Sequence, residues 1–214
     1  MSRPQAPDPL SLAGAPRFDG AGLIPVICQD AVDGSVLMLA WQTETALRLT
    51  LETRQAWFWS RSRGQLWRKG ATSGNELAVH RATLDCDADA ILLQVSPAGP
   101  ACHTGTHTCW GDAAGPLLTR LAHTIAARRT ADAHGSYVAR LLAADRTTAA
   151  GKVAEEAAEV LAAAPGSRHQ VEEAADVVFH LLVLLARDGT DPLSVLDVLA
   201  EREGLPPRWL RETT

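Results

Sequence analysis

Short apolar runs and turn residues alternate through the first half of the chain. The runs are rich in Val, Ile and Trp, which is typical of strands that bury one face. Strands are predicted over residues 22–29, 35–41, 56–60, 77–86 and 90–96. Between them, residues 43–54 place apolar side chains at helical spacing behind Thr43, a residue type that favours the N-cap. This half is predicted to be a compact, β-rich α+β domain.

The pattern changes near residues 111–116. Downstream, Ala, Leu, Glu and Arg recur at helical spacing between short breaks of Gly, Pro, Asp or Thr. Helices are predicted over residues 117–129, 136–144, 147–164, 168–188 and 192–203. Residues 177–185 are apolar on nearly all sides, as expected for the central helix of a bundle or for a dimer interface. The second half is predicted to be an all-α helical bundle.

These patterns predict how the chain is divided. The N-terminal segment is rich in Pro, Ala and Ser, which is typical of a disordered tail. The expected parts are a tail over 1–16, an α+β domain over 17–112, a linker over 113–116, a helical domain over 117–205 and a C-terminal tail over 206–214. Because the linker is short, the domains are tethered closely but need not pack tightly.

Composition narrows the class of protein. With 214 residues, of which 46% are hydrophobic, the chain can bury a core in each domain. The formal net charge of -5 gives no electrostatic footprint for nucleic acid or an anionic membrane. No apolar run approaches the length of a membrane span, and no secretory h-region opens the chain. A soluble, cytoplasmic protein with reduced thiols is expected.

Three of the four cysteines are spaced like metal ligands. Cys86 lies inside an acidic run, and Cys102 and Cys109 bracket a short loop that contains two histidines. Disulfides or ordinary buried thiols are the alternatives, but a reducing compartment argues against bridges. Three thiolates suit zinc and leave its fourth position for water, as in catalytic sites. Cys28 lies in an apolar run and is predicted to be a small core residue.

Carboxylates gather in two places. The acidic run around Cys86 carries Asp85, Asp87 and Asp89, a set that suits a hard cation such as Mg²⁺. On two successive predicted helices, pairs three residues apart share a helix face, so four carboxylates are expected to meet in one cleft. These four are Glu156, Glu159, Glu173 and Asp176, with Lys152 one turn before them as a supporting group. The alternative is a solvated acidic face, which needs no metal.

Motifs in both halves resemble known families. Residues from about 18 to 110 resemble the phosphoribosyl-AMP cyclohydrolase family, through segments 22–25, 36–41, 57–63, 66–70, 72–75, 85–90 and 102–105. Residues from about 117 to 203 resemble phosphoribosyl-ATP pyrophosphohydrolase, an all-α, MazG-like family, through segments 135–137, 152–159 and 172–176. The resemblance implies that the two activities are fused in one chain.

The resemblance implies a function for each half. The helical domain would hydrolyse phosphoribosyl-ATP to phosphoribosyl-AMP and pyrophosphate, with the four helix carboxylates holding Mg²⁺. The first domain would then open the adenine ring between N1 and C6, using a water activated by Zn²⁺ on the three cysteines. Asp85, Asp87 and Asp89 match the magnesium positions of the cyclohydrolase family. The family also implies a homodimer in which Cys86 of one chain joins Cys102 and Cys109 of its partner.

Other polar residues are candidates to contact the substrate. His103 follows a ligand cysteine and suits a general acid or base, whereas an ordinary surface histidine is the alternative. Cations and short donors suit phosphates and sugars, and the candidates are Arg61, Lys69, Ser73, Asn75 and Lys152.

Two other functions stay open at this point. One is a zinc-binding interaction module joined to a helical dimerisation domain. The other is a zinc-binding, cyclohydrolase-like module fused to a pyrophosphohydrolase of ordinary dNTPs.

Overall fold

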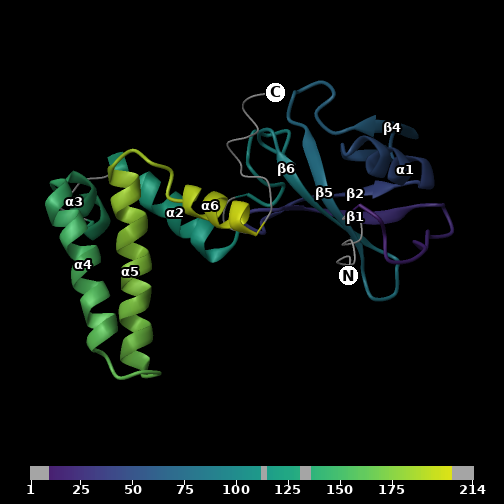
Figure 1. The fold of residues 1–214 in the computed structure, drawn as a ribbon. Helices are drawn as coiled ribbons and strands as arrows, with labels where there is room; N and C mark the ends of the chain where they lie inside the picture. The colour runs from purple at the N-terminus through teal and green to yellow at the C-terminus, as the bar shows by residue number, and fades with distance from the viewer. Residues whose placement is uncertain (1–9, 112–114, 131–135, 204–214) are drawn as a thin grey trace. The chain divides into compact units, whose positions relative to one another are not determined.

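The computed structural model describes residues 10–111, 115–130 and 136–203, which belong to two compact units (Figure 1). One unit comprises the described residues up to Pro116 together with residues 200–203, and the other comprises Leu117–Leu199. The described strands lie in the first unit together with one helix, and the second unit is helical, so the predicted α+β class with a helical second half is confirmed. Several predicted segments lie outside the described residues, namely 1–9 of the tail, 113–114 of the linker, Gly135 of a family motif, and 204–214.

The first unit is built on a four-stranded sheet in the order β2-β1-β6-β5. Its strands are β1 (Ile24–Asp30), β2 (Val36–Gln42), β5 (Leu77–Leu84) and β6 (Ile91–Pro97). β1 pairs antiparallel with β2 and parallel with β6, and β5 pairs antiparallel with β6. Alternate β1 residues are buried, including Cys28 in the core as predicted. Leu10 is also buried in this core, so packing begins within the stretch predicted as a tail.

A separate hairpin joins β3 (Trp57–Ser60) to β4 (Gln65–Arg68). Its turn contains Gly64 at φ 61°, a conformation that favours glycine. The Phe58 and Trp67 ring centroids lie 5.0 Å apart across the two strands. The pattern missed β4 because only two of its four residues are apolar, too few to show an alternation. Pairing with β3 makes this segment a strand.

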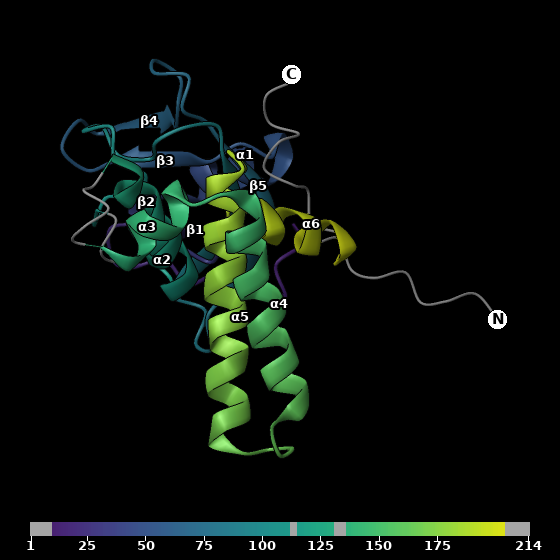
Figure 2. The same ribbon diagram turned by 90° about the vertical axis from the view of Figure 1, so that its left-hand side faces the viewer.

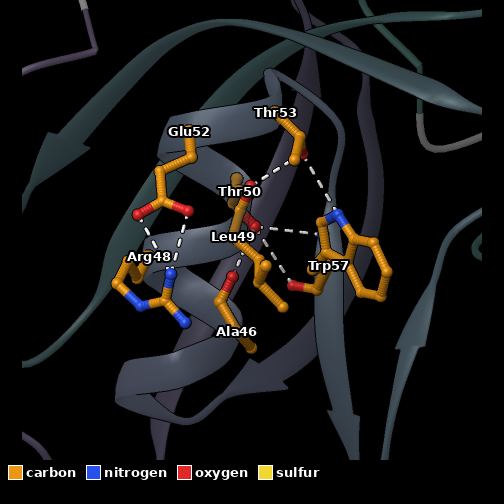
Figure 3. A network of polar contacts seen from close by, with 7 residues as sticks. All are labelled: Ala46, Arg48, Leu49, Thr50, Glu52, Thr53 and Trp57. Carbon is orange, nitrogen blue, oxygen red and sulfur yellow. Dashed lines mark hydrogen bonds and ion pairs between the residues drawn. The ribbon is translucent and has the colours of Figure 1, made fainter.

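Helix α1 (Glu44–Thr53) begins where predicted, because the Thr43 side chain accepts a hydrogen bond from the Ala46 N–H at 3.3 Å. Such a cap is worth about 1 kcal/mol. The other end of the helix is fixed to β3 (Figure 3). The Trp57 backbone N–H donates to Thr50 Oγ1 at 3.0 Å, and its indole N–H donates to Thr53 Oγ1 at 3.1 Å. These contacts hold the hairpin beside the helix.

The second unit is helical. Its elements are α2 (Leu117–Ala127), the 3-10 turn η2 (Arg128–Thr130), α3 (Tyr137–Ala143), α4 (Arg146–Ala162) and α5 (Arg168–Arg187), followed by the part of α6 (Ser194–Arg202) up to Leu199. Side chains of Ser136, Asp145 and Ser167 cap the starts of α3, α4 and α5. Helices α4 and α5 lie side by side along their length (Figures 1 and 2). Their pairing brings the two predicted carboxylate pairs to facing positions.

The apolar segment of α5 is only partly buried within the described chain. Leu182 and Val183 pack into the core of the helical unit with Ile125 of α2. Val178 and Leu181 are 43% and 36% exposed on the same helix. Of the helices that the structure describes, none is long and apolar enough to cross a membrane.

Candidate active sites

The loop after β6 carries two of the three predicted zinc ligands. It folds back on itself through hydrogen bonds from the Ala101 N–H to the His107 carbonyl at 3.1 Å and from the Cys102 N–H to the Thr106 carbonyl at 3.2 Å. The Cys109 N–H donates to the Leu37 carbonyl of β2 at 2.9 Å, which fixes the loop to the sheet. As a result, the Cys102 and Cys109 thiols interact with each other.

The Cys102 thiol is unusually acidic. Thr104 Oγ1 donates a hydrogen bond to Cys102 Sγ at 3.1 Å. Several hydrogen bonds lower the pKa of Cys102 from 9.0 to about 6, and this one has the largest effect. Desolvation, followed by the negative charge of Cys102, raises the pKa of Cys109. A cation between the two thiols would stabilise both as thiolates, the form that binds zinc. The exposed His103 lies beside them, with Nδ1 3.9 Å from Cys102 Sγ.

Thr104→Val is expected to raise the pKa of Cys102 towards that of an ordinary thiol, because the strongest hydrogen bond to the thiolate is lost. The rate at which iodoacetamide alkylates Cys102 in metal-free protein, followed by peptide mass spectrometry across pH, gives this pKa. The midpoint should move up from about pH 6. Thr124→Val is the control, since that hydroxyl bonds the Arg120 carbonyl on α2. An unchanged midpoint in Thr104→Val would show that the Thr104 hydrogen bond does not lower the pKa of Cys102.

A cavity of about 620 Å³ opens beside the two thiols. The predicted site residues that line it are Lys69, Ser73, Asn75, Cys102, His103 and Cys109. Lys69 is buried, and its Nζ donates to the Asn75 carbonyl at 3.2 Å. Burial lowers the pKa of Lys69, while the nearby Cys109 thiol opposes that change. The cavity thus combines thiols, an imidazole, an amine and short polar groups, which suits a phosphorylated ligand.

Arg61 lies elsewhere in the same unit. Its guanidinium carbon stands 4.6 Å from the ring centroid of Trp41, a cation–π contact. Trp41 lines a second cavity of about 350 Å³ together with Phe18, Arg17 and Asp89. Arg61 is therefore not among the residues that line the larger cavity.

The acidic run forms an exposed cluster at the turn between β5 and β6. Asp85, Asp87 and Asp89 each offer a carboxylate oxygen within 4.8 Å of the others. Asp85 Oδ1 accepts hydrogen bonds from the Ala90 and Asp89 backbone N–H groups at 3.1 and 3.0 Å, which lower the pKa of Asp85. Arg17 lies 3.9 Å from Asp87 and 3.8 Å from Asp89. The three carboxylates are thus close enough to share a hard cation.

Cys86 does not join the other two thiols within one chain. It is exposed within the acidic turn, whereas Cys102 is buried in its loop. Over the described residues, no group of close ligand atoms contains all three thiols. A single copy of the chain therefore presents a pair of thiols and a separate third one.

Helices α4 and α5 bring three of the four predicted carboxylates together. Glu156, Glu173 and Asp176 have ligand atoms within 4.8 Å of one another. Lys152 Nζ lies 3.0 Å from Glu156 and 2.7 Å from Glu155. Its hydrogen bond is the main reason that the pKa of Glu156 is lowered. In the absence of a metal, Lys152 therefore neutralises part of the acidic cluster.

Glu159 is exposed and lies at the edge of this group. It is close enough to Glu173 to raise the pKa of that side chain, after the larger effect of burial. The neighbouring Glu156 raises it further. Such mutual repulsion is what a bound divalent cation relieves.

The sequence pattern missed one residue in this site. His180 is only 5% exposed, and its Nε2 lies 3.6 Å from Glu156 Oε1. The Tyr137 and Phe179 rings meet its ring edge to face. Burial lowers the pKa of His180, and the negative charge of Glu156 opposes this change. Its position, four residues after Asp176, was a signal of a shared helix face, but the apolar residues around it favoured a core role.

Comparison with known proteins identifies the family of the chain. The phosphoribosyl-AMP cyclohydrolase model matches residues 38–111, and the phosphoribosyl-ATP pyrophosphohydrolase model matches residues 118–203. The histidine biosynthesis bifunctional protein HisIE of Gloeobacter violaceus is 42% identical over 206 residues, covering 92% of this chain and 94% of that protein. The chain belongs to the bifunctional HisIE family. HisIE proteins of Bacillus subtilis and Thermus thermophilus are 43% and 45% identical, covering 87% and 88% of this chain and 94% and 92% of their own lengths.

Membership of the HisIE family confirms the resemblance seen in the motifs. The chain is a multifunctional hydrolase of histidine biosynthesis, with a cyclohydrolase and a pyrophosphohydrolase domain. The alternative of a zinc-binding interaction module joined to a helical dimerisation domain, without catalysis, is therefore excluded. The cyclohydrolase family also implies metal dependence, and the described residues include acidic groups able to hold ions.

Proposed function

We propose that the chain catalyses two consecutive hydrolyses on small nucleotide substrates. Residues 117–205 convert phosphoribosyl-ATP to phosphoribosyl-AMP and pyrophosphate, and residues 17–112 then open the adenine ring of phosphoribosyl-AMP between N1 and C6. The observation that carries this proposal is the presence of two different candidate metal sites, a carboxylate cluster and a thiol pair, one in each matched domain. The cytoplasm is the proposed compartment, because all four cysteines are free thiols.

In the pyrophosphohydrolase, we assign Glu156, Glu173 and Asp176 as the residues that hold Mg²⁺, with Glu159 at the edge of the site. The cation would neutralise charge on the triphosphate and orient it for attack by water. Lys152 lies 3.0 Å from Glu156 and 2.7 Å from Glu155, and its ammonium group at the edge of the carboxylate cluster would bind a phosphate oxygen of the substrate. Facing carboxylates whose charges repel support this assignment.

In the cyclohydrolase, we assign Cys102 and Cys109 as zinc ligands together with Cys86 of the partner subunit. Zinc would lower the pKa of its bound water enough to supply hydroxide near neutral pH. The exposed imidazole of His103 stands beside the thiols and can carry a proton to or from the reacting ring.

The remaining residues of this domain are assigned to substrate and magnesium. Lys69, Ser73 and Asn75 line the cavity beside the thiols and are suited to hold phosphates and sugar hydroxyls. Asp85, Asp87 and Asp89 form the proposed Mg²⁺ site. Arg61 stays a candidate phosphate contact, because its guanidinium group packs on Trp41, which lines the second cavity.

The proposed homodimer follows from the separation of the thiols. Cys86 is exposed and apart from the other two, so a complete set of three ligands needs a second copy of the chain. Each active site would then contain residues of both subunits, and activity would depend on dimer concentration.

Mixing two inactive variants, Cys86→Ser and Cys109→Ser, is expected to restore part of the ring-opening activity. A mixed dimer holds one intact ligand set and one doubly damaged set, so random exchange should return about one quarter of the wild-type rate. Subunit exchange is checked separately with differently tagged chains. If the chains exchange and no activity returns, the site is built within one chain.

The proposed substrates are tested by supplying each one separately. The purified protein should open added phosphoribosyl-AMP and release pyrophosphate from phosphoribosyl-ATP far faster than from ordinary dNTPs. Comparable rates on dNTPs would favour the nucleotide-pool pyrophosphohydrolase instead.

A further inference from the structure

A third group of metal-ligand side chains lies in the strand-rich unit, and neither proposed reaction uses it. Asp30 ends β1, Asp33 belongs to the turn before β2, and His107 lies on the cysteine loop. One ligand atom of each lies within 4.8 Å of the other two. The cluster therefore connects the β1–β2 turn to the loop that carries Cys102 and Cys109.

Asp30 has a buried carboxylate oxygen that a bound ion would satisfy. Its side chain is 1% exposed, and its Oδ1 accepts from the backbone N–H groups of Val32 at 2.9 Å and Asp33 at 3.4 Å. Its Oδ2 is buried and has no hydrogen-bond partner in the part of the chain that the structure describes. A buried carboxylate oxygen without a partner is costly, so proteins rarely leave one unless it binds water or an ion.

The other two residues are placed to complete such a site. Asp33 and His107 are half-buried, and Asp33 Oδ1 also accepts from the Ser35 N–H at 2.8 Å, which orients the carboxylate. The backbone of His107 is fixed by the Ala101 hydrogen bond. Ligand bonds of about 2.1 Å allow ligand atoms on one ion to lie at most about 4.2 Å apart. A small movement of the half-buried side chains is therefore sufficient to enclose an ion.

We propose that Asp30, Asp33 and His107 bind a divalent transition-metal ion. Two carboxylate oxygens and one imidazole nitrogen suit ions such as manganese, or zinc, which accepts imidazole as well as thiolate ligands, whereas Cu(I) selects soft sulfur ligands. Because His107 lies two residues from Cys109, the bound ion fixes the cysteine loop to the β1–β2 turn. The alternative is a plain imidazole–carboxylate contact with no metal, and the test separates the two.

The test counts cobalt, used as a spectroscopic substitute for zinc, on the full-length protein after equilibrium dialysis. Cobalt bound to thiolates gives strong near-ultraviolet charge-transfer absorption, whereas cobalt bound to carboxylates and imidazole does not. His107→Ala and Asp33→Asn should each bind about one ion per chain fewer than wild type, or bind it at least tenfold more weakly. Their thiolate absorption should be unchanged.

Matched controls are His123→Ala and Asp145→Asn. His123 is an exposed histidine on α2, and Asp145 is a capping aspartate that belongs to none of the three clusters of candidate metal ligands. Both should bind as much cobalt as wild type. If His107→Ala also loses the thiolate absorption, its loop has been disrupted and Asp33→Asn, which lies outside the loop, decides. Wild-type cobalt content and affinity in Asp33→Asn would overturn the proposal and leave the imidazole–carboxylate contact.

Discussion

Cys102→Ser is expected to abolish ring opening while phosphoribosyl-AMP accumulates from phosphoribosyl-ATP. The serine hydroxyl is not ionised near neutral pH, whereas the Cys102 thiol, with a pKa of about 6, is a thiolate. Loss of this ligand should lower the cyclohydrolase rate at least about 100-fold, since even indirect supports of a metal site cost 10–100-fold. Chromatography of both nucleotides and the opened product measures the change.

Cys28→Ala provides the control for Cys102→Ser. Cys28 is fully buried in the sheet core, and burial raises the pKa of its thiol to about 12, so it is protonated and not available as a ligand. This variant should keep both activities. Ring opening that persists in Cys102→Ser would remove the zinc assignment, while the pyrophosphohydrolase assignment would be unaffected.

Glu156→Gln is expected to stop pyrophosphate release while added phosphoribosyl-AMP is still opened. The amide keeps the shape of the side chain but loses the charge that attracts a cation, and it removes the ionic partner of Lys152. The rate of pyrophosphate release should fall at least about 100-fold. A coupled pyrophosphate assay measures it, with elemental analysis of bound magnesium as a second observation.

Glu172→Gln is the matched control for Glu156→Gln. Glu172 is exposed on α5, pairs with Arg168 at 2.7 Å, and belongs to none of the three carboxylate groups. Its pyrophosphate release should match that of wild type. If Glu156→Gln also releases pyrophosphate at the wild-type rate, the carboxylate cluster is only a solvated acidic surface.

Local sequence patterns predicted the elements that carry their own signal. The alternation of apolar residues predicted β1 and β6, and Thr43 marked the start of α1. Strand β4 had no such signal, because pairing with β3 rather than its own pattern makes it a strand. The start of α4 was predicted one residue late, at Thr147, since Asp145 is the residue that caps it.

The sites show the same division between local and tertiary information. Spacing on one helix predicted that Glu173 and Asp176 share a face, but the register of α4 against α5 decides that Glu156 joins them and Glu159 stays at the edge. His180 could not be assigned from an apolar run, because its contact with Glu156 crosses between helices.

The proposed two-step hydrolysis is tested most directly by one time course with phosphoribosyl-ATP as the only substrate of the purified, metal-loaded protein. Pyrophosphate, phosphoribosyl-AMP and the ring-opened product are measured in the same samples. We expect pyrophosphate and opened product to reach equal final amounts, while phosphoribosyl-AMP first accumulates and is then consumed. Pyrophosphate release with no opened product, or no pyrophosphate release at all, would contradict it.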